Sequence, residues 1–147
     1  MTYVSVVIPT YNRMALTLKA IDSVETKNPE LVEIIVVDDA GEDVFVFPNQ
    51  KNKHGVQVRV TRMSVNSGAG LARKRGVESA LGKYIAFLDS DDEYVEGWID
   101  SLIFHKNFNK NIFFVGRTIG GNKSAEIVRR FMEFWPQKFR KKLAMGI

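Results

Sequence analysis

The sequence contains no cysteine, which excludes disulfide bonds and thiolate metal sites and fits a reducing compartment. No apolar run approaches the roughly 20 residues that a membrane-spanning helix needs. The first residues, MTYVSVVIPTYNR, lack the basic start and long apolar core of a secretory signal. No internal repeat or low-complexity segment is present either. We therefore expect a cytoplasmic protein without a membrane span.

The composition is that of an ordinary folded domain. The 147 residues are 45% hydrophobic and 26% charged. A chain of this length can bury about two thirds of the surface that it exposes when unfolded, so a sizeable core is expected. The formal net charge of +4 indicates only a mild preference for anionic partners.

Hydrophobic periodicity predicts strands that alternate with helices. Near-continuous β-branched runs indicate strands buried on both faces, whereas the alternation in VQVRVTRM indicates a half-exposed strand. Pro9 is expected to end the first strand. Strands are predicted at 3–8, 31–37, 56–63, 83–88 and 111–116, and helices at 14–26, 68–81, 95–106 and 124–142. This order predicts an α/β fold with a mainly parallel central sheet flanked by helices on both faces.

Three polar clusters follow predicted strands directly. They are PTYNR (9–13), DDAGED (38–43) and DSDDE (89–93). In open α/β sheets, ligands bind outside the carboxyl ends of the strands. We therefore expect the three clusters to meet at one edge of the sheet.

The third cluster concentrates negative charge in a chain whose net charge is positive. Asp89, Asp91, Asp92 and Glu93 fall within five positions, and like charges about 4 Å apart repel by roughly 4 kcal/mol at an effective dielectric near 20. One interpretation is a Mg²⁺ or Mn²⁺ site shared with a diphosphate, because such ions take one or two carboxylates beside water and phosphate. The other is that Asp91 or Asp92 caps the helix expected near residue 95. Both can hold at once.

The other polar residues also admit two interpretations each. The Asp38-Asp39 pair can accept hydrogen bonds from a nucleobase or a ribose, or it can form an Asx turn before Gly41. The Tyr11 ring can stack on a base or pack over the sheet edge. Arg73 can meet phosphate or base oxygens, or it can be an ordinary solvated helix residue.

Together these segments resemble the family-two inverting glycosyltransferases with the GT-A fold. The resemblance is carried by VSVVIPTYNR (4–13), EIIVVDDAGED (33–43) and NSGAGLARKRGVESALGKYIAFLDSDD (66–92), in the family's order and spacing, and it covers about residues 3–116. It implies a Rossmann-like nucleotide-binding core, assigned here to 1–120, and a nucleotide-sugar donor that is often UDP-linked. It also implies a divalent metal, Mn²⁺ or Mg²⁺, and inversion at the sugar carbon. The acceptor is expected to be an unidentified glycan or lipid-linked molecule.

The resemblance assigns a nucleotide-binding role to the first two clusters. Tyr11 is similar to the family's uracil-stacking tyrosine, and Pro9 and Thr10 shape that pocket. Asp39, the second residue of its pair, is similar to the carboxylate that contacts the base. Asp38 is included as a further nucleotide-binding candidate.

The resemblance assigns the metal and the rest of the nucleotide to the other two segments. Asp89 and Asp91 are similar to the family's D-x-D motif, with Asp91 in direct contact with the metal and Asp89 nearer the ribose and the metal. Arg73 is similar to a position that helps to hold the nucleotide. Asp92 continues the common DSDD form and supports the site or caps the next helix.

One part of the family's pattern is missing. In the family the general base is an Asp or Glu beyond the strand that follows D-x-D, often in a Glu-Asp pair. After Gly116 this sequence offers only Glu126 and Glu133, and neither lies in a Glu-Asp pair. The family's later Gln-x-x-Arg-Trp motif is not present either. We therefore name no catalytic base. The chain is a fragment, a short natural variant, or half of a site that another chain completes. A nucleotide-binding module without catalysis stays an alternative function. A nucleotidyltransferase is disfavoured, because PTYNRMA is not a Gly-rich basic loop.

The C-terminal segment 121–147 is basic and rich in aromatic residues. Basic amphipathic helices can lie on anionic membrane surfaces, so peripheral contact with the inner face of a membrane is one interpretation. The other is that the aromatic side chains pack on the sheet. Nucleic-acid binding is not expected, because the basic residues form no single stripe along the chain.

Overall fold

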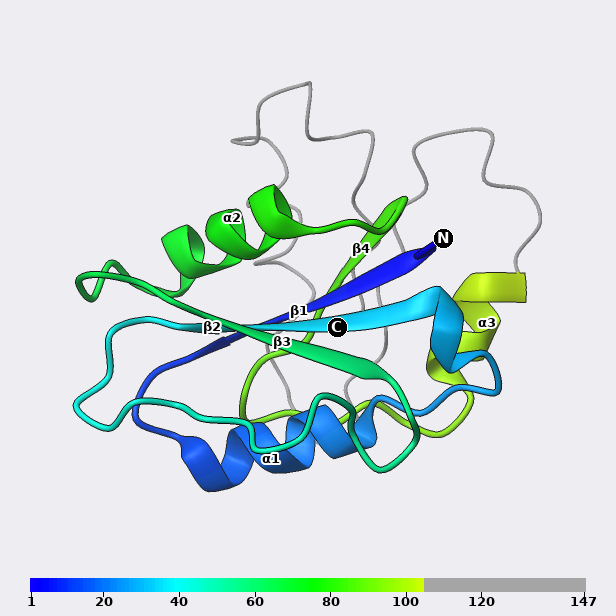
Figure 1. Cartoon of the computed structure of the whole chain (residues 1–147), viewed down its shortest axis with the longest axis horizontal. Coiled ribbons are helices and arrows are strands. Elements are labelled where there is room, and N and C mark those ends of the chain that lie inside the picture. Colours follow the sequence, from blue (N-terminus) through cyan, green and yellow to red (C-terminus); the bar gives the residue numbers. More distant parts are fainter. Residues whose placement is uncertain (105–147) are drawn as a thin grey trace, which may run out of the picture.

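The structure, a computed structural model, describes residues 1–104 and contains a parallel sheet with helices on both faces (Figure 1). The strands are β1 (Val4–Thr10), β2 (Val32–Asp38), β3 (Gln57–Arg62) and β4 (Tyr84–Phe87), in the spatial order β3-β2-β1-β4. The helices are α1 (Met14–Ser23), α2 (Ala69–Ser79) and α3 (Trp98–Phe104), with a 3-10 turn η1 at Pro29–Leu31. The predicted fold class is confirmed. The strand predicted at 111–116, the helix predicted at 124–142 and the boundary at residue 120 lie outside the described residues.

The centre of the sheet is formed by β1 and β2, which pair along their whole length. Every residue of both strands is buried, as their β-branched runs predict. At the edge, β3 buries only Val58 completely, which confirms the predicted half-exposed strand. The sheet therefore has a covered interior and one partly solvated edge.

The helices divide the core between the two faces of the sheet. On one face α1 and α3 bury Ile21, Ile99 and Leu102 against the sheet, and on the other α2 buries Ala72 and Val77 (Figure 1). Within residues 1–104, no helix combines the length and the apolar character that crossing a bilayer requires.

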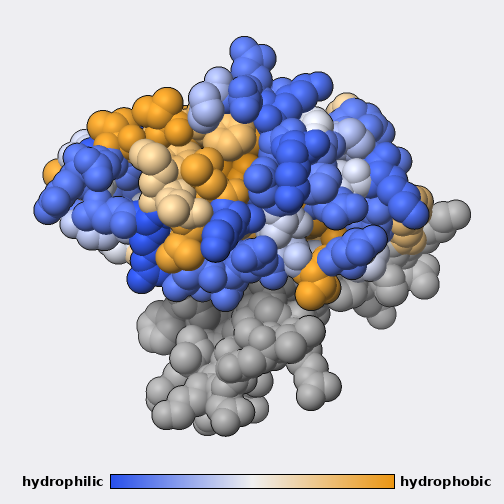
Figure 2. Space-filling view, turned by 90° about the horizontal axis from the view of Figure 1, so that it is seen from below, coloured by the Kyte–Doolittle hydropathy of each residue, from blue (hydrophilic) through white to orange (hydrophobic). Residues whose placement is uncertain are grey.

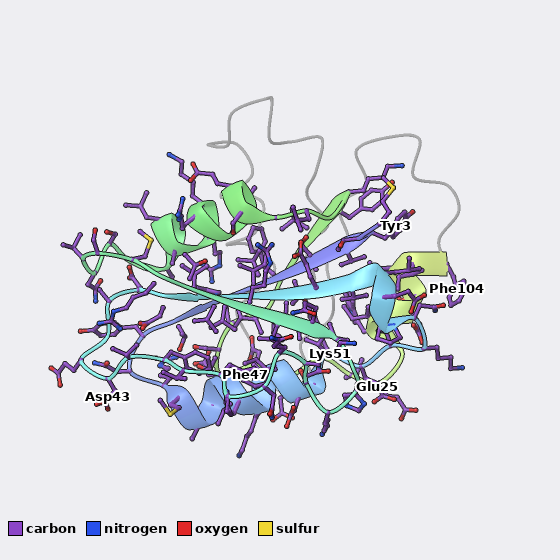
Figure 3. The ribbon with its side chains drawn as sticks, in the orientation of Figure 1. Tyr3, Glu25, Asp43, Phe47, Lys51 and Phe104 are labelled. Atoms are coloured by element: carbon purple, nitrogen blue, oxygen red, sulfur yellow. The ribbon has the colours of Figure 1, made fainter. Side chains whose placement is uncertain are left out.

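The side of the molecule that carries α1 is partly apolar. Phe47, in the loop after β2, packs against the core beneath it (Figure 3). Figure 2, viewed from this side, shows apolar atoms gathered over one region with hydrophilic atoms around them. Exposed apolar side chains of α1 and this loop are Met14, Leu16, Leu18, Val44 and Val46.

Pro9 does not end the first strand, contrary to the sequence prediction. β1 continues through Thr10, and Pro9 lies opposite Val37 of β2. Along a strand, the backbone N–H and C=O groups of successive residues point alternately toward the neighbouring strand on one side and the neighbouring strand on the other. The Val7 carbonyl accepts a hydrogen bond from Leu88 N at 3.1 Å, so Pro9 also faces the β4 side. Because β4 ends at Phe87, opposite Val7, the missing N–H of Pro9 removes no ladder hydrogen bond.

The third helix begins later than predicted. It starts at Trp98 rather than near residue 95, after Gly97, whose φ of 77° is a left-handed conformation that favours glycine. Val95 precedes the helix and is exposed. The acidic cluster is therefore separated from the helix by several residues.

Gly76 sets the distance between α2 and the sheet, and its substitution tests this packing. A Cβ at Gly76 would lie 2.3 Å from Val7 Cγ1 and 3.3 Å from Val37 Cγ2. We expect Gly76→Ala to lower the free energy of unfolding by about 1–3 kcal/mol, as overpacking of a close contact does. Chemical denaturation of the full chain measures this change.

Gly70→Ala is the matched control in the same helix. Apart from its chain neighbours and the adjacent helix backbone, no atom lies within 4 Å of a Cβ built at Gly70, so alanine should leave the stability unchanged or raise it by up to about 1 kcal/mol. Equal effects of the two substitutions would contradict a close approach of α2 at Gly76.

Candidate functional site

The three polar clusters meet in one cleft at the carboxyl edge of the sheet. The cleft has a volume of about 210 Å³. Its lining comes from the end of β1, the residue after β2, the start of α2 and the segment after β4: Pro9, Thr10, Tyr11, Arg13, Asp39, Ala69 and Ser90. The sequence prediction that three strand ends converge is therefore confirmed.

The end of β1 is held by backbone and side-chain contacts that leave Tyr11 accessible. The Thr10 carbonyl accepts a hydrogen bond from Asp39 N at 2.9 Å, and its hydroxyl contacts that of Thr17 in α1 at 2.6 Å. Asn12 has a left-handed backbone and its Oδ1 accepts a hydrogen bond from Glu42 N at 2.8 Å. Tyr11 lies between these anchors and is 43% exposed. Its ring is available at the cleft rather than packed over the sheet.

The paired aspartates have different environments. Asp38 is buried and accepts hydrogen bonds from Gly41 N and Phe45 N, both at 3.1 Å, and it forms an ion pair with Arg62 of β3. It therefore closes the turn after β2, and its contacts favour the structural interpretation over the nucleotide contact included among the predictions. It is not among the residues that line the cleft.

Asp39 faces the cleft and organises the entry to α2. Its two carboxylate oxygens accept hydrogen bonds from Ser67 N at 2.9 Å and Gly68 N at 2.7 Å. The sequence did not indicate these contacts of Ser67 and Gly68 with Asp39, because a backbone N–H donor leaves no signature in residue type. A carboxylate has about four acceptor positions, so Asp39 keeps capacity for a ligand.

Two acidic side chains of the segment pair with arginines from two helical regions. Asp91 Oδ2 accepts a hydrogen bond from Arg13 Nη1 at 2.8 Å, and Asp89 pairs with Arg73 of α2. α3 begins at Trp98, whose N–H donates to the Val95 carbonyl at 3.2 Å, so neither Asp91 nor Asp92 lies at its N-cap and the predicted helix cap is wrong. The sequence did not indicate the role of Arg13, because its partner lies 78 residues away.

Asp92 shows the residual cost of crowding the acidic side chains. Partial burial raises the pKa of its carboxyl group, and the negative charges of Asp89 and Asp91 raise it further. Its backbone N–H donates to the Asp89 carbonyl at 3.0 Å, which closes a turn. The two arginines therefore offset only part of the repulsion within the segment.

Tyr94, the residue that follows the acidic segment, also holds it in place through contacts with α1 and β4. Its backbone N–H donates to Ser23 Oγ at 3.0 Å, and its hydroxyl donates to the Phe87 carbonyl at 2.8 Å. The ring stacks on Trp98 with the centroids 4.9 Å apart. Burial raises the pKa of the Tyr94 phenol, and the charge of Asp89 adds to this shift. Tyr94 therefore anchors the acidic segment to both β4 and α1.

Asp89 and Asp91 are the described residues that could contribute ligands to a divalent cation, since both carry a carboxylate. Asp89 and Asp91 have half-exposed carboxylates, and each uses one oxygen in its arginine pair. Within the described part of the chain, no group of three or more His, Asp or Glu residues is arranged to hold a metal. Mg²⁺ and Mn²⁺ suit such a site, because one or two carboxylates suffice when water and substrate phosphate supply the other ligands.

Comparison with known proteins identifies the class. Residues 5–146 match the sequence profile of glycosyl transferase family 2. The match covers nearly the whole chain, and the chain belongs to this family.

Individual relatives agree with this assignment. An uncharacterized glycosyltransferase of Rickettsia felis is 37% identical over 112 residues, which are 76% of this chain and 18% of that protein. A GalNAc(5)-diNAcBac-PP-undecaprenol beta-1,3-glucosyltransferase of Campylobacter jejuni is 33% identical over 110 residues, 73% of this chain and 35% of that protein. The chain thus spans little more than a third of these relatives at most.

Solved structures show the same fold. S. aureus TarS 1-349 in complex with UDP-GlcNAc superposes with a TM-score of 0.72 at 23% sequence identity, covering 84% of this chain and 37% of that one. The same protein with UDP gives a TM-score of 0.70. The parallel sheet and its flanking helices are therefore those of the GT-A, Rossmann-like fold.

Replacement of Asp38 tests its structural role. Asp38→Ala leaves Arg62 Nη1 and two backbone N–H groups without their acceptor, so we expect a loss of about 3 kcal/mol in the free energy of unfolding. Asp43→Ala is the control. Asp43 lies in the same loop and is exposed at its outer side (Figure 3), so the change should stay within about 0.5 kcal/mol. Unaltered stability of Asp38→Ala with lost nucleotide binding would contradict the structural role.

Proposed function

We propose that this domain binds the nucleotide of a nucleotide-sugar donor, UDP-linked, and takes part in metal-dependent transfer of the sugar to an acceptor with inversion. The observation that carries this proposal is the single cleft in which Tyr11, Asp39 and the segment after β4 meet. Membership of family 2 supports sugar transfer. The TarS complexes with UDP-GlcNAc and UDP support a uridine nucleotide as the ligand class.

The contacts in the cleft suit the parts of such a donor. The exposed Tyr11 ring provides a face on which a uracil base can stack. Asp39 lies beside it and can accept a hydrogen bond from a base N–H. Thr10 and Pro9 also line the cleft, and Arg73 of α2 pairs with Asp89.

The leaving group sets the chemical requirement at the acidic segment. Sugar transfer releases a nucleoside diphosphate, whose negative charge increases as the glycosidic bond breaks. A divalent cation held by Asp91 and Asp89 would act there as a Lewis acid that stabilises this charge. The chain's own contribution is to fix these carboxylates, which Tyr94 and the turn from Asp89 to Asp92 do.

A nucleotide-binding module without catalysis is the second candidate. No general base or acceptor site is assigned within residues 1–104. Both candidates predict binding of UDP with a divalent cation, but only the first predicts turnover, so an assay of donor hydrolysis or sugar transfer separates them.

The cellular location and the acceptor remain predictions. A cytoplasmic protein in contact with the inner face of a membrane, acting on a glycan or lipid-linked acceptor, is the arrangement we propose. Its membrane contact depends on residues 121–147, which lie outside the described part of the chain.

Replacement of Tyr11 tests the nucleotide site. We expect UDP to bind the full chain in the presence of Mn²⁺ and GDP to bind less tightly, measured by calorimetric titration. Tyr11→Ala should weaken UDP binding roughly ten-fold or more, because stacking contributes about 1–3 kcal/mol per base. Tyr11→Phe keeps the ring and should keep the affinity. Equal affinities of all three proteins would remove Tyr11 from the site.

Replacement of Asp91 tests the metal. In Asp91→Asn the carboxylate is lost, so we expect the affinity for UDP to become the same with Mn²⁺ as with a chelator. Asp43→Asn makes the same change on an exposed loop and should retain the Mn²⁺ effect. An unchanged Mn²⁺ dependence in Asp91→Asn would refute the assignment of the metal to this residue.

A further inference from the structure

Arg13 occupies a position that the proposed function does not explain. It lies between the end of β1 and the start of α1, and it lines the cleft together with Tyr11 and Asp39. Its guanidinium group donates to Asp91 Oδ2 at 2.8 Å. The chain thus places a fixed positive charge on the carboxylate that is proposed to hold the cation.

The ion pair between Arg13 and Asp91 can be broken at little cost in free energy. Both side chains are 51% exposed, and exposed ion pairs contribute little net stability because water competes for both partners. By contrast, Arg73 is only 21% exposed in its pair with Asp89 and does not line the cleft. Of the two arginines, Arg13 is therefore the one that a ligand in the cleft can reach and displace.

We propose that Arg13 is a displaceable counter-cation, which holds Asp91 when the cleft is free of nucleotide and exchanges it for the diphosphate when a nucleotide and a divalent cation bind. This inference rests on the proposed function. A cation arriving alone competes with Arg13 for Asp91 and binds weakly. A diphosphate arriving with the cation offers Arg13 a new anionic partner, and arginine pairs well with phosphate through its planar set of donors.

The exchange makes binding of the cation and of the nucleotide cooperative. Arg13 lowers the affinity of the free protein for the cation, and it stabilises the bound diphosphate in the complex. Each ligand therefore raises the affinity for the other by the same factor. The ion pair also compensates the charge of Asp91 when no ligand is present. Arg13 thereby acts as a positioning residue for Asp91 and as a binding residue for the phosphate.

The test compares two affinities in the same variant. We expect Arg13→Gln to bind Mn²⁺ alone roughly two- to five-fold more tightly than the wild type, because an exposed competing ion pair has been removed. We expect it to bind UDP at saturating Mn²⁺ roughly ten-fold or more weakly, because a charged hydrogen bond to phosphate has been lost. Electron paramagnetic resonance of free Mn²⁺ measures the first affinity, and calorimetry measures the second.

Two further variants serve as controls. Arg13→Lys keeps the positive charge but loses the planar donors, so its Mn²⁺ affinity should stay near that of the wild type while its UDP affinity falls in between. Lys19→Gln removes one exposed positive charge from α1 and should change neither affinity. Thermal unfolding of each variant verifies that it is folded.

The outcomes separate the inference from the function on which it rests. Opposite changes of the two affinities in Arg13→Gln support the exchange, because a merely structural residue would weaken both. Equal loss of both affinities, or no change in either, overturns it. If the wild type binds UDP with Mn²⁺ while Arg13→Gln behaves like the wild type, only the role of Arg13 fails. If the wild type binds neither ligand, the proposed function fails and the exchange fails with it.

Discussion

The site depends on the pairing of β1 with β2. In this parallel register Thr10 lies opposite Asp38, and the hydrogen bond from Asp39 N to the Thr10 carbonyl extends the pairing by one step. Tyr11 and Asp39 consequently emerge at the same edge of the sheet. β4 stops earlier, with Phe87 opposite Val7, so the chain after β4 turns away while β1 continues. Pro9 and Thr10, which lie beyond the last residue of β1 that pairs with β4, line the cleft.

Charge compensation across the fold explains how a chain can tolerate four acidic residues within five positions. The compensating groups are neither solvent alone nor a helix terminus. They are arginines from the start of α1 and from α2, which reach Asp91 and Asp89 respectively. The two ion pairs differ in exposure. The pair of Arg73 with Asp89 is the less exposed and the harder to break, and the pair of Arg13 with Asp91 is the more exposed and the easier to break. The pair of Arg13 with Asp91 also connects the start of α1 to the segment after β4.

Much of the fold followed from sequence, because β-branched runs and helical periodicity report burial directly. The convergence of the three clusters followed as well, since carboxyl ends of parallel strands share an edge. The sequence pattern alone did not predict that Asp38 closes a turn while Asp39 lines the cleft. Adjacent side chains point in different directions, and the pattern does not say which one is turned inward. The pairing of Arg13 with Asp91 depends on tertiary distance alone. Pro9 was misjudged because its tolerance in a strand depends on where the neighbouring strand ends.

Buried Glu33 has a consequence for how this domain assembles. Its carboxylate accepts hydrogen bonds from Ser5 Oγ at 2.6 Å, Leu81 N at 2.7 Å and Arg59 Nη2 at 2.6 Å. These donors belong to β1, to the turn before β4 and to β3. If only some of these donors surrounded the buried Glu33 carboxylate, its charge would be poorly compensated. Partly folded states that lack one of these elements are therefore high in free energy. The domain should consequently melt as one cooperative unit, with strands that are distant in sequence acquiring their order together.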